Sequence, residues 1–311
     1  MDVSILILRQ MLYYFIMILM GFVLVKAKKL RSEESRFVSV VAVYLVTPCV
    51  IINAFQMEYS AETVHGLLLA LGAAVAAHLL FLLLITILGK VCGLNAVEKA
   101  SVMYTNSGNM IIPVVLAVLG PEWVLYSSVY VSFQLLLQWT HGRRLISGEK
   151  GFNLKIILSN IHIWSILLGL LLFLLRVRLP GLIIDTLSGV GGLLAPLSMF
   201  VMGMLMAGND LRKSFANRRI YLIAALRLLL CPLLVLVMFW LSGAVRLLPN
   251  AATILFISFL ACTTPPAVAT TQMAQLFGND AEYASAINII TTIFSLVTIP
   301  LMTTLYWSLI G

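Results

Sequence analysis

The sequence predicts an all-α membrane protein of ten spans, arranged as two inverted five-helix repeats in which spans four and nine are broken and cross each other. Three observations predict this fold: an apolar composition, basic residues concentrated in alternate loops, and two matched interruptions in apolar segments. Hydrophobic residues occupy 61% of the 311 positions and charged residues only 10%, whereas soluble domains carry about 25% charged residues. A helical span needs about 20 apolar residues. The segments that qualify are 4–25, 37–57, 64–89, 100–119, 123–141, 156–176, 182–207, 219–243, 251–276 and 283–309.

The positions of the basic residues predict the orientation of these spans. The net charge of +8 would suggest nucleic acid as a partner of a soluble protein, but here no nucleic-acid partner is expected. Most basic residues fall in odd-numbered loops, which are cytoplasmic by the positive-inside rule. We therefore expect a multi-pass protein of the cell (plasma or inner) membrane with both termini outside. These loop residues are Lys26, Lys28, Lys29, Arg31, Arg36, Lys90, Lys99, Arg143, Arg144, Lys150, Lys155, Arg212, Lys213, Arg218 and Arg219.

Corresponding features in the two halves indicate an internal duplication. The second span of each half carries a central proline, Pro48 and Pro196, and the fourth span of each half carries a break. Because five spans reverse the direction of entry, such a duplication makes an inverted repeat. The predicted divisions are a first repeat at 1–141, a cytoplasmic linker at 142–155 and a second repeat at 156–311.

The two breaks are the best candidates for a binding site. The first reads Thr105-Asn106-Ser107-Gly108-Asn109 with Pro113 one turn later, and the second reads Thr263-Thr264-Pro265-Pro266 with Thr270 and Thr271 following. Freed backbone groups survive at membrane depth only where protein or a water-filled cavity covers them. Paired broken spans indicate the midplane site of a transporter, although glycine and proline also kink packed helices without binding anything. The candidate substrate-binding residues are Asn106, Gly108, Asn109, Thr264, Pro265, Pro266, Thr270 and Gln134, and Pro113, Pro48 and Pro196 are expected to shape the crossover.

The broken helices favour an anionic ligand. The N-terminal end of a half-helix resembles about half a positive charge, worth roughly 0.3–1 kcal/mol to an exposed anion and up to ~2 kcal/mol when partly buried. If the two breaks meet, two such ends and the amides of Asn106 and Asn109 converge. We therefore expect a carboxylate or a similar anion to bind there.

The acidic residues narrow the mechanism by their positions. All of them lie in loops or at span ends, whereas a proton-driven antiporter needs an intramembrane carboxylate. Sodium bound by carbonyls and hydroxyls at the breaks remains an alternative. No catalytic or metal-ligand cluster is visible in the sequence, so neither an enzyme, a metal nor a cofactor is expected.

Two ionisable residues within spans have more than one interpretation. Arg227 lies inside the eighth span, where an arginine costs about 2.5–3.5 kcal/mol on insertion scales. It could snorkel to the inner interface, attract an anionic substrate or cap the carbonyls of a broken helix. His78 lies at the centre of the third span and is either a hydrogen-bonded core residue or part of a proton relay.

The chain resembles the auxin efflux carrier family, the bacterial relatives of the plant PIN-formed auxin exporters, over nearly its whole length. Single motifs are weak, but their order and spacing together are specific. The matching residues are Asn106-x-Gly108-x-x-x-x-Pro113 with Gly120, the run Ser198 to Ala207, Leu226-Arg227 with Pro232, Gln134 with Gln138-Trp139, and Pro265-Pro266 with Ala274, Gly278, Asp280, Ala286-Ile287 and Pro300.

The resemblance implies a function and a mechanism. Members of the family have ten spans in two inverted repeats. Spans one, two, six and seven form a scaffold that makes a homodimer, and the other six spans form a transport subdomain that moves like an elevator. The resemblance also implies organic anions as substrates, such as malate or auxin, with the carboxylate near Asn106.

We therefore expect a carrier in the lipid bilayer that exports small organic anions, driven by the membrane potential. The alternatives are a sodium-coupled organic anion symporter and a membrane sensor that transports nothing.

Overall fold

The computed structural model describes residues 3–56, 60–148 and 161–310. Within these ranges the regular structure is helical, and the one strand-like feature is an isolated antiparallel bridge between Thr105 and Pro266. The prediction of an all-α protein is confirmed. Parts of the predicted linker and of the predicted second and sixth spans, at 149–155, 57 and 156–160, lie outside the described residues.

The helices of the first half follow the predicted apolar segments. A π-helical turn at Ala42–Val46 joins α2 to α3, and another at Gln138–Gly142 joins α7 to α8. The helices are α1 (Val3–Lys26), α2 (Ser35–Val41), α3 (Thr47–Ala54), α4 (Ala61–Val91), α5 (Ala96–Met103), α6 (Ser107–Val118), α7 (Val124–Leu137) and α8 (Arg143–Ser147).

The second half has a similar succession of long and short helices. A π-helical turn at Leu226–Leu230 joins α14 to α15. The helices are α10 (Ile161–Leu174), α11 (Gly181–Gly191), α12 (Leu194–Ala207), α13 (Leu211–Ala216), α14 (Arg218–Ala225), α15 (Cys231–Ser242), α16 (Ala251–Thr263), α17 (Val268–Leu276) and α18 (Ala281–Leu309).

Six helical segments of the described chain are long and apolar enough to cross a membrane. They correspond to six of the ten predicted spans, and α6, α10 and α16 are shorter apolar helices. The number ten therefore stays a prediction, whereas several spans are present. The six segments are Ile5–Lys26, Ser32–Ala54, Ala61–Val91, Gly181–Ala207, Arg218–Ser242 and Ala281–Leu309.

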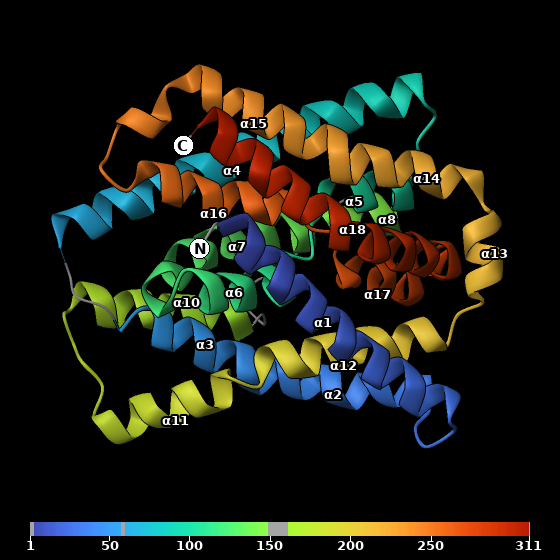
Figure 1. Ribbon diagram of the computed structural model, residues 1–311, viewed down its shortest axis with the longest axis horizontal. Helices are drawn as coiled ribbons and strands as arrows, with labels where there is room; N and C mark the ends of the chain where they lie inside the picture. Colours follow the sequence, from blue (N-terminus) through green and yellow to red (C-terminus); the bar gives the residue numbers. More distant parts are fainter. Residues whose placement is uncertain (1–2, 57–59, 149–160, 311) are drawn as a thin grey trace.

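The backbones of α1 and α12 approach each other closely, and the two helices lie together in the lower half of Figure 1. A Cβ atom added to Gly203 would lie 1.9 Å from the carbonyl oxygen of Ile18, and one added to Gly21 would lie 2.3 Å from that of Phe200. Small residues let backbones approach this closely where lipid supplies no hydrophobic driving force between helices. These two glycines fix the contact between the first span and the seventh.

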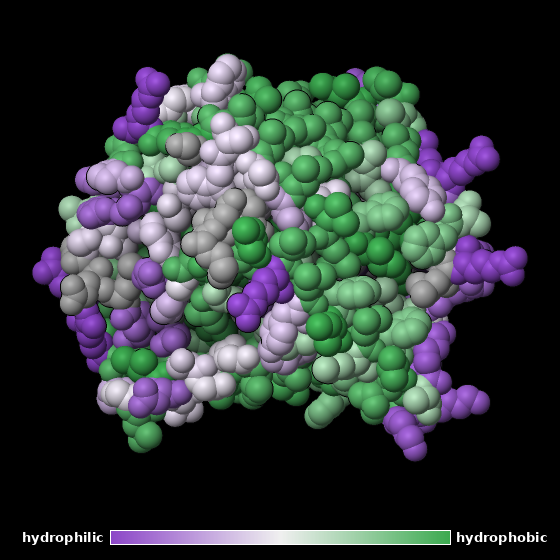
Figure 2. All heavy atoms as spheres, viewed as in Figure 1, coloured by the Kyte–Doolittle hydropathy of each residue, from purple (hydrophilic) through white to green (hydrophobic). Residues whose placement is uncertain are grey.

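The connections between helices gather at opposite ends of the molecule. The α1–α2 turn and α13 lie at the right of Figure 1, whereas the α10–α11 and α15–α16 connections lie at the left. Figure 2 shows hydrophobic side chains over much of the middle of this face, with hydrophilic side chains gathered towards both ends. Leucine, isoleucine and aromatic side chains of α1, α4 and α15, such as Leu68 and Trp240, are exposed on the molecule. Such a surface is expected of a protein that lies in a bilayer.

Candidate functional site

The two predicted breaks contact each other directly. The first separates α5 from α6 at Tyr104–Asn106, and the second separates α16 from α17 between Thr264 and Ala267. The Asn106 amide donates to the Pro265 carbonyl at 2.8 Å, and the Ala267 amide donates to the Tyr104 carbonyl at 2.9 Å. The breaks thus share one antiparallel bridge, and each satisfies backbone groups of the other.

Local sequence explains the second break most simply. Pro265 and Pro266 have no N–H to donate to a helix, and the residue before a proline is driven towards extended conformation. Thr264 accordingly has φ −73° and ψ 155°. The first break lacks a proline at its centre. There Thr105, Asn106 and Ser107 have side chains that compete for backbone hydrogen bonds, which disfavours a helix interior.

Two amide side chains hold the breaks from neighbouring helices. Gln134 of α7 accepts from the Thr105 amide at 3.1 Å and from the Thr105 hydroxyl at 2.5 Å, and its own Nε2 donates to the Thr105 carbonyl at 2.7 Å. Asn288 of α18 donates to the Pro266 carbonyl at 2.8 Å. Both side chains stabilise backbone groups that the breaks leave without helical partners, because an unsatisfied buried polar group costs about 1–3 kcal/mol.

Arg227 satisfies carbonyls of both broken spans. Its Nε donates to the carbonyl of Thr264 at 3.0 Å, its Nη1 to that of Val102 at 2.7 Å, and its Nη2 to that of Cys262. The side chain is fully buried, so it does not snorkel to an interface. Of the three sequence interpretations, the structure has Arg227 capping the carbonyl ends of α5 and α16.

A cavity of about 270 Å³ lies on the opposite side of the breaks, where α6 and α17 begin. Asn106, Gly108 and Asn109 line it from the first break, and Ala267 to Ala269 line it from the second. Residues from α2, α3, α7, α10 and α12 and from the π-helical turns after α2 and α7 close the remainder. The described residues that line the cavity include no Lys, Arg, Asp or Glu. Two helix N-termini therefore supply much of the positive potential of the cavity.

Hydrogen-bond donors without partners lie at this end of α6. The Met110 amide donates to the Asn106 carbonyl at 3.1 Å, so the amides of residues 107–109 have no acceptor in the preceding turn. The Asn106 side chain accepts from Asn109 Nδ2 at 3.1 Å, while its own Nδ2 is buried without a partner among the described residues, as is the Ser107 hydroxyl. Such groups carry a desolvation cost that an acceptor from a ligand removes.

The comparison with known families agrees with this geometry. A model of the membrane transport protein family matches residues 6–157 and 150–303. The chain belongs to the membrane transport protein family. This family contains the auxin efflux carriers, so the resemblance noted from the sequence is confirmed. A relative from Methanothermobacter thermautotrophicus, named an uncharacterized transporter, is 29% identical over 227 residues, which are 71% of this chain and 68% of the relative.

The predicted site residues of this membrane transport protein take different positions. Asn106, Gly108, Asn109 and Gln134 line the cavity, whereas Thr264, Pro265, Pro266 and Thr270 do not belong to its lining. Pro113 lies within α6, Pro48 in the first turn of α3 and Pro196 in the first turn of α12.

His78 lies apart from the cavity in a buried aromatic cluster. It belongs to α4, where its Nδ1 forms a 2.7 Å hydrogen bond with the Ala74 carbonyl. The rings of Phe81, Tyr130 and Phe133 surround it with centroids 5.0–6.1 Å away. This geometry is that of a hydrogen-bonded core histidine, the first of the two sequence interpretations.

Several cavity-lining residues of this transport protein were not among the predicted site residues. Ser39, Thr47 and Ser198 contribute hydroxyl groups, and His162 contributes a ring. Thr47 precedes Pro48, and Ser198 lies two positions after Pro196. The paired prolines therefore mark the segments of the second and seventh predicted spans that reach the cavity. The two prolines are visible in the sequence, but they were expected to shape the crossover and not to mark residues that line a cavity.

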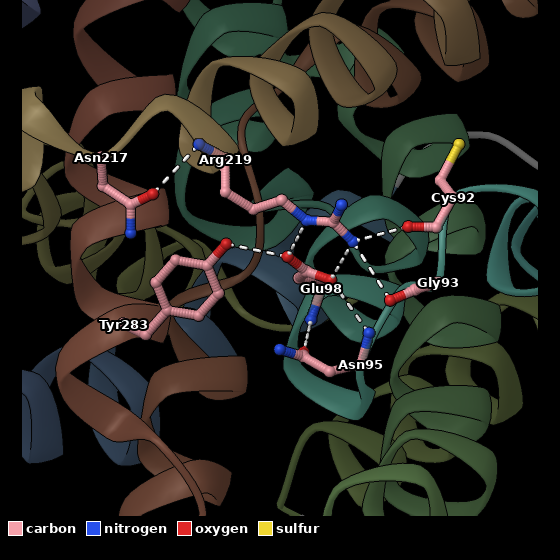
Figure 3. A network of polar contacts seen from close by, with 7 residues as sticks. All are labelled: Cys92, Gly93, Asn95, Glu98, Asn217, Arg219 and Tyr283. Carbon is pink, nitrogen blue, oxygen red and sulfur yellow. Dashed lines mark hydrogen bonds and ion pairs between the residues drawn. The ribbon is translucent and has the colours of Figure 1, made fainter.

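A second polar network fixes α5 at its end remote from the break (Figure 3). Glu98 is buried and accepts from Arg219 Nε at 2.7 Å, from Arg219 Nη2 at 3.0 Å and from the Tyr283 hydroxyl at 2.8 Å. It also forms a capping box with Asn95. Burial alone would raise the pKa of Glu98, but hydrogen bonds from Arg219, the Asn95 backbone and Tyr283 outweigh burial and lower the pKa below its usual value. The sequence placed Glu98 at a span end without indicating its burial.

Proposed function

We propose that this membrane transporter carries small organic anions and binds the anionic group where α6 and α17 begin. The observation that carries the proposal is that two half-helix N-termini and the unpartnered Asn106 amide border one cavity without an acidic lining residue among those described. Helix N-termini with free N–H groups favour carboxylate and similar anions.

The balance of charge at the crossover supports a monoanion. Two N-terminal ends amount to about one positive charge facing the cavity, and the two C-terminal ends of α5 and α16 amount to about one negative charge. Arg227 hydrogen-bonds to those C-terminal carbonyls, so its charge offsets theirs. The cavity is left with the positive ends, which match one carboxylate.

The remainder of the lining supports an apolar body on the substrate. Val131, Leu135, Trp139, Val201 and Met202 line the same cavity, and no described lining residue is a cation that could pair with a second carboxylate. We therefore rank auxin-like or other apolar monocarboxylates above malate.

The mechanism we propose is efflux by an elevator movement across ten spans in two inverted repeats. The crossover contacts join α5, α7, α14–α15, α16 and α18, which belong to the six spans assigned to the transport subdomain. The cavity lies between these helices and α2, α3, α10 and α12 of the proposed scaffold, through which a homodimer would form. Because the inside of the cell is electrically negative, outward movement of a monoanion is favoured by about 2.3 kcal/mol per 100 mV. Coupling to an ion is then unnecessary.

Flux measurements in proteoliposomes test this proposal. Wild-type protein is expected to move indole acetate or benzoate faster than malate, and an inside-negative potential is expected to accelerate efflux. Asn106→Ala and Asn106→Asp should lower flux by about tenfold or more, equivalent to about 1.4 kcal/mol, because the first removes a donor and the second adds a repelling carboxylate.

Asn250→Ala is the matched control, because Asn250 hydrogen-bonds to Glu62 at an exposed position. Its flux should equal that of wild type. Equal flux in wild type, Asn106→Asp and Asn250→Ala would remove the crossover from the binding site. Wild-type flux no higher than in empty liposomes for every organic anion would reject carriage of organic anions.

A further inference from the structure

We propose that the Arg227 guanidinium stands in the place of a coupling cation, so that the crossover needs no sodium, and that removing it leaves a site for a small monovalent cation. The consequence for transport rests on the proposed function. The binding site itself does not, because it is defined by the contacts of Arg227 alone.

The ligand set around the guanidinium is one that suits a cation. Three backbone carbonyl oxygens, those of Val102, Cys262 and Thr264, face its three nitrogens. In broken transport helices, unwound carbonyls and half-helix C-termini are the groups that coordinate Na⁺. Val102 and Cys262 lie in the last turns of α5 and α16, where carbonyls have no intrahelical donor.

The charge at this place comes from the helix ends and not from a carboxylate. Among the described residues Arg227 forms hydrogen bonds with carbonyl oxygens and no ion pair with Asp or Glu. Two C-terminal ends supply about one negative charge between them, and one guanidinium supplies one positive charge. A monovalent cation would complete the same balance, whereas a neutral side chain would leave it uncompensated.

The surrounding residues hold the guanidinium in place. Arg227 lies in the π-helical turn before α15, a local widening that often re-aims residues at functional sites. Its guanidinium carbon lies 5.2 Å from the centroid of the Phe81 ring, a distance suited to cation–π attraction. The side chain is fully buried. A tethered cation therefore cannot exchange with solvent ions during a transport cycle, which separates this carrier from a sodium symporter.

Thermal unfolding in detergent tests the site without knowledge of the substrate. The melting temperature of wild type should be the same in sodium and in choline chloride. Arg227→Ala should melt at a lower temperature than wild type, and low concentrations of guanidinium chloride should raise its melting temperature. The melting temperature of Arg227→Ala should also be higher in sodium chloride than in choline chloride. Urea has a similar shape without the charge and should not restore stability.

Arg246→Ala is the matched control, because Arg246 is exposed outside the crossover. Guanidinium should not raise its melting temperature. The proposal is overturned if sodium stabilises wild type over choline, or if guanidinium fails to raise the melting temperature of Arg227→Ala above its effect on Arg246→Ala. If Arg227→Ala does not fold, Arg227→Lys replaces it. Arg227→Lys keeps the charge with fewer hydrogen-bond donors, whereas Arg227→Met loses the charge. Guanidinium should therefore raise the melting temperature of Arg227→Lys less than that of Arg227→Met.

Flux then separates the two proposals. Wild-type flux should be independent of a sodium gradient, and flux by Arg227→Ala should fall about tenfold or more and recover partly with guanidinium. A wild type that transports no organic anion contradicts the proposed function, while the melting data still decide the cation site.

Discussion

The amide of Asn106 donates to the carbonyl of Pro265 at 2.8 Å, which joins the centres of two broken helices from opposite halves of the chain. The same two breaks direct their carbonyl ends to Arg227 and their amide ends to the cavity. Opposite partial charges are thereby separated across one bridge. Removal of groups that stabilise the bridge should therefore affect folding and anion binding together.

Gln134 provides the first such test. Gln134→Leu removes three hydrogen bonds to Thr105 and leaves the buried backbone amide and carbonyl of Thr105 unsatisfied. Each unsatisfied group costs about 1–3 kcal/mol of stability. We expect a clearly lower melting temperature and loss of flux. Gln138→Leu is the control for stability, because Gln138 Nε2 is buried without a partner among the described residues. An equal loss of stability in both variants would contradict the role given to Gln134.

The sequence predicts the breaks well but not the groups that hold them. Pro265 and Pro266 impose the second break through local backbone chemistry, and such effects are readable along the chain. The partners of Arg227 are different, because Val102 lies on another half-helix and reaches the guanidinium only through packing. For the same reason the sequence predicts Gln134 only as a substrate-binding residue, and does not reveal that its side chain also hydrogen-bonds to Thr105 while it lines the cavity.

The α1–α12 crossing predicts a sharp difference between two glycines. Gly203→Ala puts a Cβ atom 1.9 Å from the Ile18 carbonyl oxygen, so the two backbones must separate, at a cost of about 1–3 kcal/mol. Gly72→Ala adds a Cβ atom with nothing within 4 Å, and alanine favours a helix over glycine by about 1 kcal/mol. Thermal unfolding should show Gly203→Ala below wild type and Gly72→Ala at or above it. The reverse order would show that α1 and α12 do not pack in this way.

The lowered pKa of Glu98 predicts that its contribution to stability changes with pH only in the acidic range. Because its pKa is lowered on folding, the carboxylate adds stability that is present above its unfolded pKa, about 4.3, and is lost as pH falls through the lowered value. Between pH 5 and 8 Glu98 therefore stays ionised. The melting temperature of Glu98→Gln should lie below that of wild type at neutral pH, and the gap should narrow in acid.

Glu62→Gln is the control for this pH series, because Glu62 accepts a hydrogen bond from Asn250 at an exposed position. Its melting temperature should stay close to that of wild type throughout. A gap between Glu98→Gln and wild type that stays constant down to pH 3 would contradict the titration assigned to Glu98.

The proposed elevator movement predicts which cysteine pairs can be crosslinked without loss of flux. Met202 of α12 and Thr292 of α18 touch at 3.8 Å across the boundary between the proposed scaffold and transport subdomains. Glu62 of α4 and Asn250, the residue before α16, contact each other within the proposed transport subdomain. A short thiol crosslinker on Met202→Cys with Thr292→Cys should stop flux until it is reduced. The same reagent on Glu62→Cys with Asn250→Cys should leave flux unchanged, because those positions would move together. Full flux through the crosslinked first pair would mean that α12 and α18 do not slide past each other, and the elevator would have to be given up even if anion transport itself is retained.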